Sequence, residues 1–166
     1  MLAIKTNCEW VNPYCSNAFF ISRCQRLVTC HNKKPELSSV FIYEMITAFG
    51  GPDKFYKYFY ISAVSPLGFV KDRKNLNYYD DKMLLQKIEP FAVACIEKQL
   101  TFGLHRDTCF CIGEGENLRF LKNLNQRHKW FDEIKPLSHP RFVMQYKLKR
   151  KAEYIQQYIN TLSLKV

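Results

Sequence analysis

The sequence predicts an α/β fold with a mainly parallel sheet, on three observations. Segments typical of strands alternate with segments typical of helices along most of the chain, an order found where helical crossovers join parallel strands. Apolar residues make up 47% of the 166 residues and aromatic residues 15%, which excludes a disordered chain. The length suits one domain.

Residues 1–33 are predicted to form an atypical N-terminal segment. They show no clear apolar periodicity, and they hold four of the seven cysteines, namely Cys8, Cys15, Cys24 and Cys30. Only Ala18–Ile21 resembles a short buried strand. The cysteine spacings lack the short pairs of zinc sites, so no metal ion is predicted. An odd cysteine count and the lack of a signal-peptide pattern favour a reduced, cytoplasmic protein.

From residue 34 onward, helix and strand signals alternate regularly. Ser38-Ser39 and Gly50-Gly51 bracket an apolar-periodic run that predicts a helix. Pro52 begins a second, short helix to Lys57, and the aromatic and β-branched run Tyr58–Val64 predicts a strand. Residues 68–80, rich in Lys, Asp and Asn, are predicted to form a loop.

The second half of the chain continues the alternation. Its predicted elements are a helix capped by Asp80-Asp81 and running to Leu100, a strand over Thr108–Ile112, a helix over Glu114–Asn125, a short strand or connector over Trp130–Ile134 and a helix over Phe142–Leu162. Pro90 predicts a kink or break in the first helix. Because binding crevices lie at the carboxyl ends of parallel strands, the loops at Ser65–Gly68, Gly113–Gly115 and Ser138–Arg141 are predicted to share one rim.

Positive charge points to a polyanionic partner. Lys plus Arg number 25 against 15 acidic residues, for a formal net charge of +10. Five cations lie between Ser138 and Lys151, interleaved with Phe142, Met144 and Tyr146; they are Arg141, Lys147, Lys149, Arg150 and Lys151. This pattern predicts a phosphate-facing loop and helix with His139 directed at a reacting group. A solvated basic helix face is the alternative.

The loop that contains Asn75, Asn77, Tyr78 and Tyr79 has a second pattern of interest. Amide side chains can recognise a base edge, and tyrosine rings can stack on a base. The alternative is an ordinary surface loop, in which asparagines serve turns.

Four stretches resemble the uracil-DNA glycosylase superfamily, in particular the bacterial branch of the single-strand-selective monofunctional enzymes. They occur in the family's order and are SAVSPLGF (62–69), KNLNYYDDKML (74–84), CIGEGENLRFLKNLN (111–125) and PLSHPRFVMQYKLKRKAEYI (136–155). The resemblance implies a three-layer α/β/α domain over residues 34–166 around a four-stranded, mainly parallel sheet. It implies a monomer that binds DNA, away from membranes, and hydrolyses the N-glycosidic bond of a flipped damaged base without metal or cofactor.

The resemblance also implies the residues of the site. His139 matches the family's second catalytic motif and would stabilise the departing uracil at O2. The residues implied to line the base pocket are Ser62, Ala63, Pro66, Leu67, Gly68, Asn75, Asn77 and Tyr78. Those implied to contact DNA are Ser138, Pro140, Arg141, Lys147, Lys149 and Arg150.

The sequence departs from the family at two places. The first motif, of the form G-[MIL]-N-P-G, positions the attacking water, yet the one Asn-Pro pair here is Asn12-Pro13, followed by Tyr14. Ala63 stands where relatives often carry an asparagine that reads uracil. We therefore expect a chain shortened or altered at its start, with the first strand missing or replaced by Ala18–Ile21, and impaired catalysis. The alternative is an inactive DNA-binding module or a truncated remnant of the same fold.

Overall fold

The computed structural model describes residues 2–6 and 36–164, which divide into two units. The first unit contains residues 2–6 and 60–137, and the second contains residues 36–59 and 138–164. The predicted boundary after residue 33, the strand predicted at Ala18–Ile21 and the four early cysteines lie outside the described residues.

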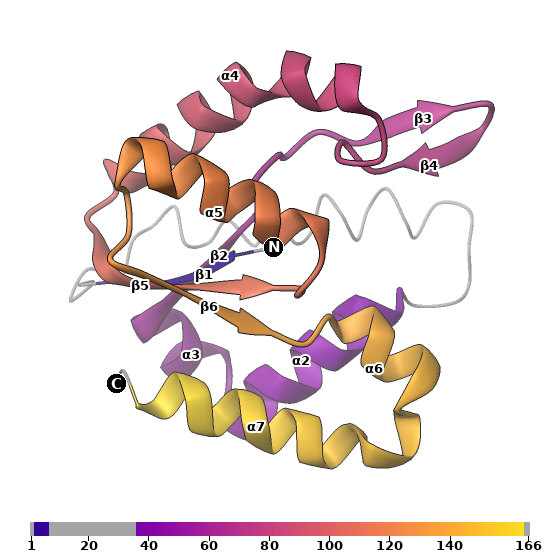
Figure 1. The fold of residues 1–166 in the computed structure, drawn as a ribbon. Coiled ribbons are helices and arrows are strands. Elements are labelled where there is room, and N and C mark those ends of the chain that lie inside the picture. The colour runs from indigo at the N-terminus through magenta and orange to yellow at the C-terminus, as the bar shows by residue number, and fades with distance from the viewer. Residues whose placement is uncertain (1, 7–35, 165–166) are drawn as a thin grey trace. The chain divides into compact units, whose positions relative to one another are not determined.

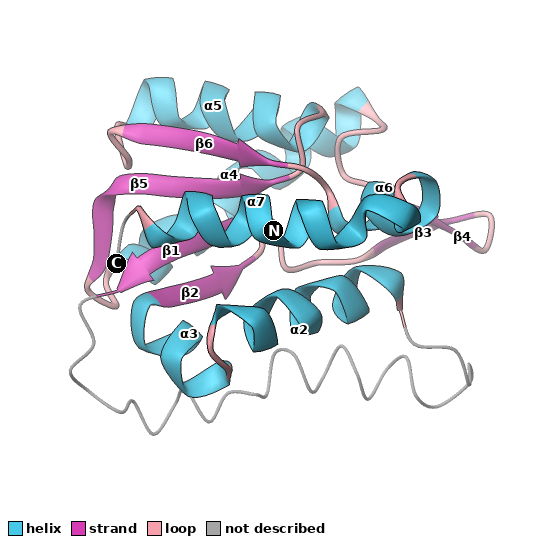
Figure 2. Cartoon of the chain, turned by 90° about the horizontal axis from the view of Figure 1, so that it is seen from below, coloured by secondary structure: helices cyan, strands magenta, loops and turns pink. Residues whose placement is uncertain are grey.

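The first unit contains a four-stranded sheet in the order β2-β1-β5-β6 (Figure 2). Its strands are β1 (Leu2–Thr6), β2 (Phe59–Ser62), β5 (Leu104–Ile112) and β6 (Glu133–Leu137). β5 and β6 run parallel, with Cys111 opposite Pro136, whereas β1 runs antiparallel to β5, with Leu2 opposite Cys111. The predicted α/β class is confirmed. A strand from residues 2–6 occupies an interior position of the sheet, and the prediction of mainly parallel pairing missed its antiparallel direction.

Helices α4 (Lys82–Leu100) and α5 (Glu116–His128) cover one face of this sheet (Figure 1). Asp81 caps α4 by accepting hydrogen bonds from the backbone N–H groups of Met83 and Leu84, and the helix continues through Pro90 without the predicted break. Both helices pack their apolar stripes on β5 in one core, which includes Ile88, Ala92, Ile96, Leu118, Leu121, Leu124, Cys109 and Cys111. All residues of Thr108–Ile112 are buried, so both faces of β5 are covered, as in an interior strand.

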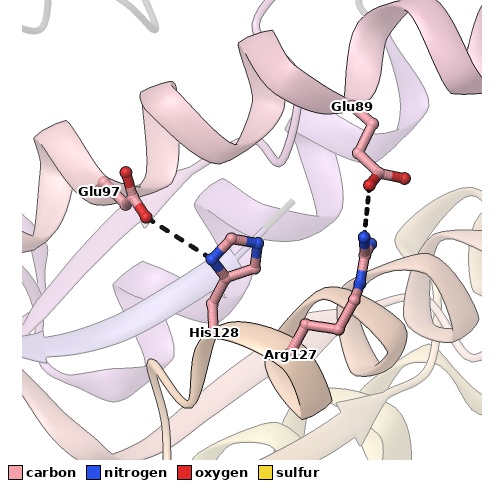
Figure 3. Close-up of polar contacts among 4 residues, drawn as sticks. All are labelled: Glu89, Glu97, Arg127 and His128. Atoms are coloured by element: carbon pink, nitrogen blue, oxygen red, sulfur yellow. Dashed lines mark hydrogen bonds and ion pairs between the residues drawn. The ribbon is translucent and has the colours of Figure 1, made fainter.

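Two ion pairs join α4 to α5 above this core (Figure 3). Arg127 Nη1 lies 2.7 Å from Glu89 Oε1, and His128 Nδ1 lies 3.7 Å from Glu97 Oε1. The His128 ring also stacks on Trp130, with ring centroids 4.6 Å apart. Because the paired side chains remain partly exposed, each ion pair contributes about 0–1 kcal/mol. The apolar core therefore supplies most of the energy that holds the two helices on the sheet.

A hairpin replaces the predicted loop at residues 68–80. It consists of β3 (Phe69–Lys71) and β4 (Lys74–Leu76), with Lys71 opposite Lys74, so its turn is only Asp72-Arg73. Both turn residues have positive φ, +51° and +61°, which defines the type I′ turn that matches the twist of two strands. The turn could not be predicted from the sequence, because Asp72-Arg73 is not the Asn-Gly or Asp-Gly pair that usually marks a type I′ turn.

The turn gives a direct stability test. Arg73→Gly is expected to raise the free energy of unfolding by about 1 kcal/mol, because an L-residue in the left-handed region is strained and glycine is not. Urea denaturation measures the change. Lys74→Gly, in the adjoining strand, is the control and is expected to lose stability. A stability loss in Arg73→Gly would contradict the turn assignment.

The second unit is helical. It comprises α2 (Leu37–Phe49), α3 (Pro52–Tyr58), α6 (Pro140–Tyr146), a 3₁₀ turn η1 (Leu148–Arg150) and α7 (Lys151–Ser163). Its aromatic core pairs Phe41 with Tyr158 and Phe49 with Phe55, in both cases edge to face. Among the described residues, none of the helices has the length and apolarity to cross a membrane.

The single helix predicted over Phe142–Leu162 is wrong, because the chain forms α6, η1 and α7 there. Val143, Tyr158 and Leu162 are buried. One continuous helix would place Lys147 and Arg150 on the same stripe as Val143, since residues four and seven apart share a helix face. The break at Lys147, whose φ is −129°, keeps these cations out of the core.

Candidate functional site

His139 is held at the start of α6 by backbone geometry. It has an extended backbone, with φ −66° and ψ 128°, and precedes Pro140, which is buried at the first helical position. Its Nδ1 accepts a hydrogen bond from the backbone N–H of Arg141 at 3.1 Å. The His-Pro pair therefore caps the helix with the imidazole ring itself, which orients the ring while its side chain stays exposed.

This hydrogen bond determines the tautomer of His139. Because Nδ1 is an acceptor, the proton of the neutral ring lies on Nε2, which is then a donor. Partial desolvation by surrounding protein atoms lowers the pKa of His139 below its usual value, against an opposing effect of Glu36, and the positive charge of Arg141 adds a smaller lowering effect. At neutral pH the ring is an uncharged donor with one free N–H.

Tyr158 supports the loop before His139. Its hydroxyl donates to the backbone carbonyl of Ser138, and its ring, 1% exposed, packs edge-on against Phe41 at 5.2 Å. A buried side chain of α7 thus holds the residue next to His139 in place. Tyr158 was not predicted as a site residue, because in the sequence it is one more apolar residue on an amphipathic helix, with no sign of a polar role.

The predicted DNA-contacting cations differ in whether they form ion pairs with acidic side chains of the protein. Arg150 is paired with Glu153, with Nη2 2.7 Å from Oε2, and the neighbouring Lys151 is paired with Glu44. Within the described part of the chain, Arg141, Lys147 and Lys149 form no ion pair. Those three side chains are the cations of this segment available to a phosphate.

The predicted base-pocket residues all lie in the first unit. Ser62 ends β2, and its hydroxyl donates to the carbonyl of Ala63 at 3.4 Å. Pro66, Leu67 and Gly68 follow in an exposed loop. Between them, the Ser65 hydroxyl oxygen is buried, and it has no hydrogen-bond partner among the described residues. An unpaired buried hydroxyl costs free energy until a ligand or water pairs it. Ser65, which lies in the predicted rim loop but not among the residues implied to line the base pocket, is therefore a further candidate.

Three further predicted pocket residues have different surroundings. Asn75 is exposed on β4, opposite Val70. Asn77 donates both its side-chain amide and its backbone N–H to Asp80 Oδ2, at 2.9 and 3.0 Å. These two hydrogen bonds close a local turn and occupy the Asn77 side chain. Asn75 is therefore the amide of this segment that is accessible to a ligand.

Tyr78 lies in the core of the first unit. It is 8% exposed, its ring contacts Tyr79 and Phe120, and its hydroxyl donates to Asn117 Oδ1. Burial raises the pKa of its hydroxyl. Asn117 in turn donates to Cys111 Sγ at 3.5 Å. Tyr78 thus ties the end of the predicted pocket segment to the turn between β5 and α5.

The glycine-rich Gly113-Glu114-Gly115 is a tight strand-to-helix turn between β5 and α5. Gly113 has φ +120°, and its N–H donates to the carbonyl of Leu137 at 2.8 Å. Across the described ranges, no cluster of His, Cys, Asp and Glu has the makings of a metal site. The structure therefore presents two separate sets of candidate residues, one in each unit: Ser62–Tyr78 in the first, and Ser138–Arg150 in the second.

Comparisons with known proteins give one informative match. No family model matches the chain, and no curated protein matches it. Among solved structures, the chain is similar to wild-type SMUG2 from Pedobacter heparinus, with 48% sequence identity and a TM-score of 0.75. The match covers 84% of this chain and 64% of that protein, so the chain spans less than two thirds of its length. The resemblance to single-strand-selective monofunctional uracil-DNA glycosylases is confirmed.

Proposed function

Because the chain resembles these glycosylases, we propose that it binds damaged DNA and acts on the N-glycosidic bond of a flipped uracil or related base. The observation that carries the proposal is the 48% identity with SMUG2 across 84% of the chain. The net charge of +10 suits a polyphosphate partner. The three-layer α/β/α arrangement and a glycosylase-like domain over residues 34–166, with β1 as an added strand of its sheet, are part of the same proposal.

In this proposal, His139 stabilises the leaving base. Hydrolysis breaks the bond between sugar C1′ and base N1, and negative charge develops on uracil, mainly at O2. The neutral tautomer of His139 offers Nε2–H as a hydrogen-bond donor. Since the ring is already oriented by the Arg141 N–H, a donor placed there would need little reorganisation as charge develops.

Other residues have distinct proposed roles. Arg141, Lys147 and Lys149 grip phosphates, while Ser138 and Pro140 shape the loop that carries His139. Around the base we place the segment Ser62–Gly68 with the amide of Asn75. Asn75 is exposed and supplies the kind of donor and acceptor pair that Ala63 lacks.

Catalysis by this chain is proposed to be impaired. None of the 166 residues forms the G-[MIL]-N-P-G motif that positions the attacking water in the family. Departure of the base can still be helped by His139, but addition of water at C1′ lacks its positioning residue. Removing a positioned catalytic group commonly costs a factor of about 10²–10⁴ in rate.

Uracil release from a labelled oligonucleotide tests the proposal. We expect this chain to release uracil more slowly than SMUG2 from Pedobacter heparinus, and His139→Ala to lower its rate by a further factor of about 10²–10³. His105→Ala, in β5, is the matched control and is expected to keep the parental rate. Full activity in His139→Ala would refute the role of His139, and release as fast as by SMUG2 would refute the impairment.

A second candidate function is a DNA-binding module without catalysis. The missing first motif and Ala63 favour it, because both remove chemistry and leave the cations intact. It predicts salt-sensitive DNA binding with no released base at any enzyme concentration. Binding that is insensitive to salt between about 50 and 200 mM would count against both functions.

A further inference from the structure

We propose that Phe142 and Tyr146 form a stacking surface for unpaired DNA bases outside the base pocket. The inference rests on the proposed function, because it requires a DNA-binding protein. It adds two side chains with no role in the glycosidic chemistry, and it states which part of the DNA they contact. The platform, as we call Phe142 with Tyr146, lies on the exposed side of α6.

Both rings of the platform are exposed to solvent. Phe142 is 43% exposed and Tyr146 is 73% exposed, and Leu148, just beyond the helix, is 56% exposed. The centroids of the two rings are 5.8 Å apart, so together they form one continuous apolar surface. Contiguous exposed apolar groups of this kind often mark an interaction site.

The platform begins three residues after His139. His139 is the N-cap of α6, and Phe142 and Tyr146, four residues apart, lie along one face of that helix. Pro140 and Val143 are buried and face the core of the unit. A DNA strand whose damaged base reaches His139 would therefore carry its neighbouring nucleotides along the platform.

The charges around the platform select the partner. Arg141, Lys147 and Lys149 flank the two rings and form no ion pair within the described residues. Aromatic rings beside free cations match a nucleic-acid strand, whose bases stack while its phosphates pair with the cations. An apolar protein partner would leave three cations without counter-charges. In a duplex the base faces are already stacked, so the platform suits unpaired bases.

Binding of undamaged single strands tests the platform without requiring catalysis. The two probes are a fluorescein-labelled oligothymidine of about ten nucleotides and a strand of equal length made of abasic sugars, titrated by anisotropy with the full chain. The double variant Phe142→Ala/Tyr146→Ala is expected to weaken binding of oligothymidine by tenfold or more. Binding of the abasic strand is expected to change less than about threefold, because it offers phosphates but no bases.

Three further variants make the result specific. Phe102→Ala removes a ring that is 52% exposed in the other unit, and it is expected to leave both affinities unchanged. Lys147→Gln/Lys149→Gln is expected to weaken binding of both probes equally and to make that binding less dependent on salt. Tyr146→Leu keeps an apolar side chain without the ring, and it is expected to lose affinity for oligothymidine alone.

The outcomes separate this inference from the proposed function. If Phe142→Ala/Tyr146→Ala loses equal affinity for both probes, or loses no affinity for oligothymidine, the platform is overturned while DNA binding by the chain stands. Failure of the parental chain to bind either probe would overturn both. Selective loss in the platform variants together with no uracil release would support the platform in a binding module.

Discussion

Replacing Tyr158 by alanine is expected to lower the free energy of unfolding by about 3–5 kcal/mol, the usual cost of deleting a large buried ring. The side chain is fully enclosed, and it loses both its edge-to-face contact with Phe41 and its hydrogen bond to the Ser138 carbonyl. Chemical denaturation followed by circular dichroism measures the change.

Tyr158→Phe separates the hydrogen bond from the packing. It keeps the ring on Phe41 but leaves the Ser138 carbonyl without this donor, which is expected to cost about 1 kcal/mol. In NMR spectra the imidazole signals of His139 are expected to shift in Tyr158→Phe, since the neighbouring loop loses its anchor. Equal losses in the two variants would show that packing contributes nothing, and unchanged His139 signals would refute the positioning role.

Asn125→Ala is the second substitution with a large expected effect. The Asn125 side chain donates to the carbonyl of Phe131 at 2.8 Å and accepts from its N–H at 2.9 Å. It thereby satisfies both backbone groups of a buried residue in the connection between α5 and β6. Alanine leaves both groups unpaired, at about 1–3 kcal/mol for each, so a loss of about 2–6 kcal/mol is expected.

Asn123 provides the matched control for this substitution. It lies on the same helix, two residues away, with its side chain exposed. Asn123→Ala is expected to change the free energy of unfolding by less than about 0.5 kcal/mol, as is usual for surface positions. Thermal unfolding of the two variants side by side distinguishes them. Equal melting temperatures would mean that the connection is held by Trp130 and Phe131 packing alone.

The sequence predicted elements well where caps and periodicity agree. The helix ending at Gly50 and the long helix after Asp81 both lie where their terminal signals placed them. The predicted bounds of β6 were wrong. A short strand or connector was predicted at Trp130–Ile134, before Pro136, but the strand is Glu133–Leu137. Proline is tolerated there because β6 is an edge strand, with no further strand on its outer side among the described residues.

The candidate site was predictable only where a residue's role is local. His139 could be found from its pairing with Pro140, since both act at one helix start. Tyr158 could not, because its partner Ser138 is twenty residues away and no pattern joins them. Asn77 illustrates the opposite error, since an amide that looks available in the sequence is already bonded to Asp80.

The position of β1 has a consequence for how the protein is made. Leu2 pairs with Cys111 and Thr6 with Leu104, so β1 and its neighbour β5 are separated by roughly one hundred residues of sequence. During synthesis the ribosome must release β5 before the interior of the sheet can close. Because α4 and α5 lie close to β5 in the sequence, packing them on β5 closes shorter loops than the pairing of β1 does, so the pairing of β1 has the larger loop-closure cost.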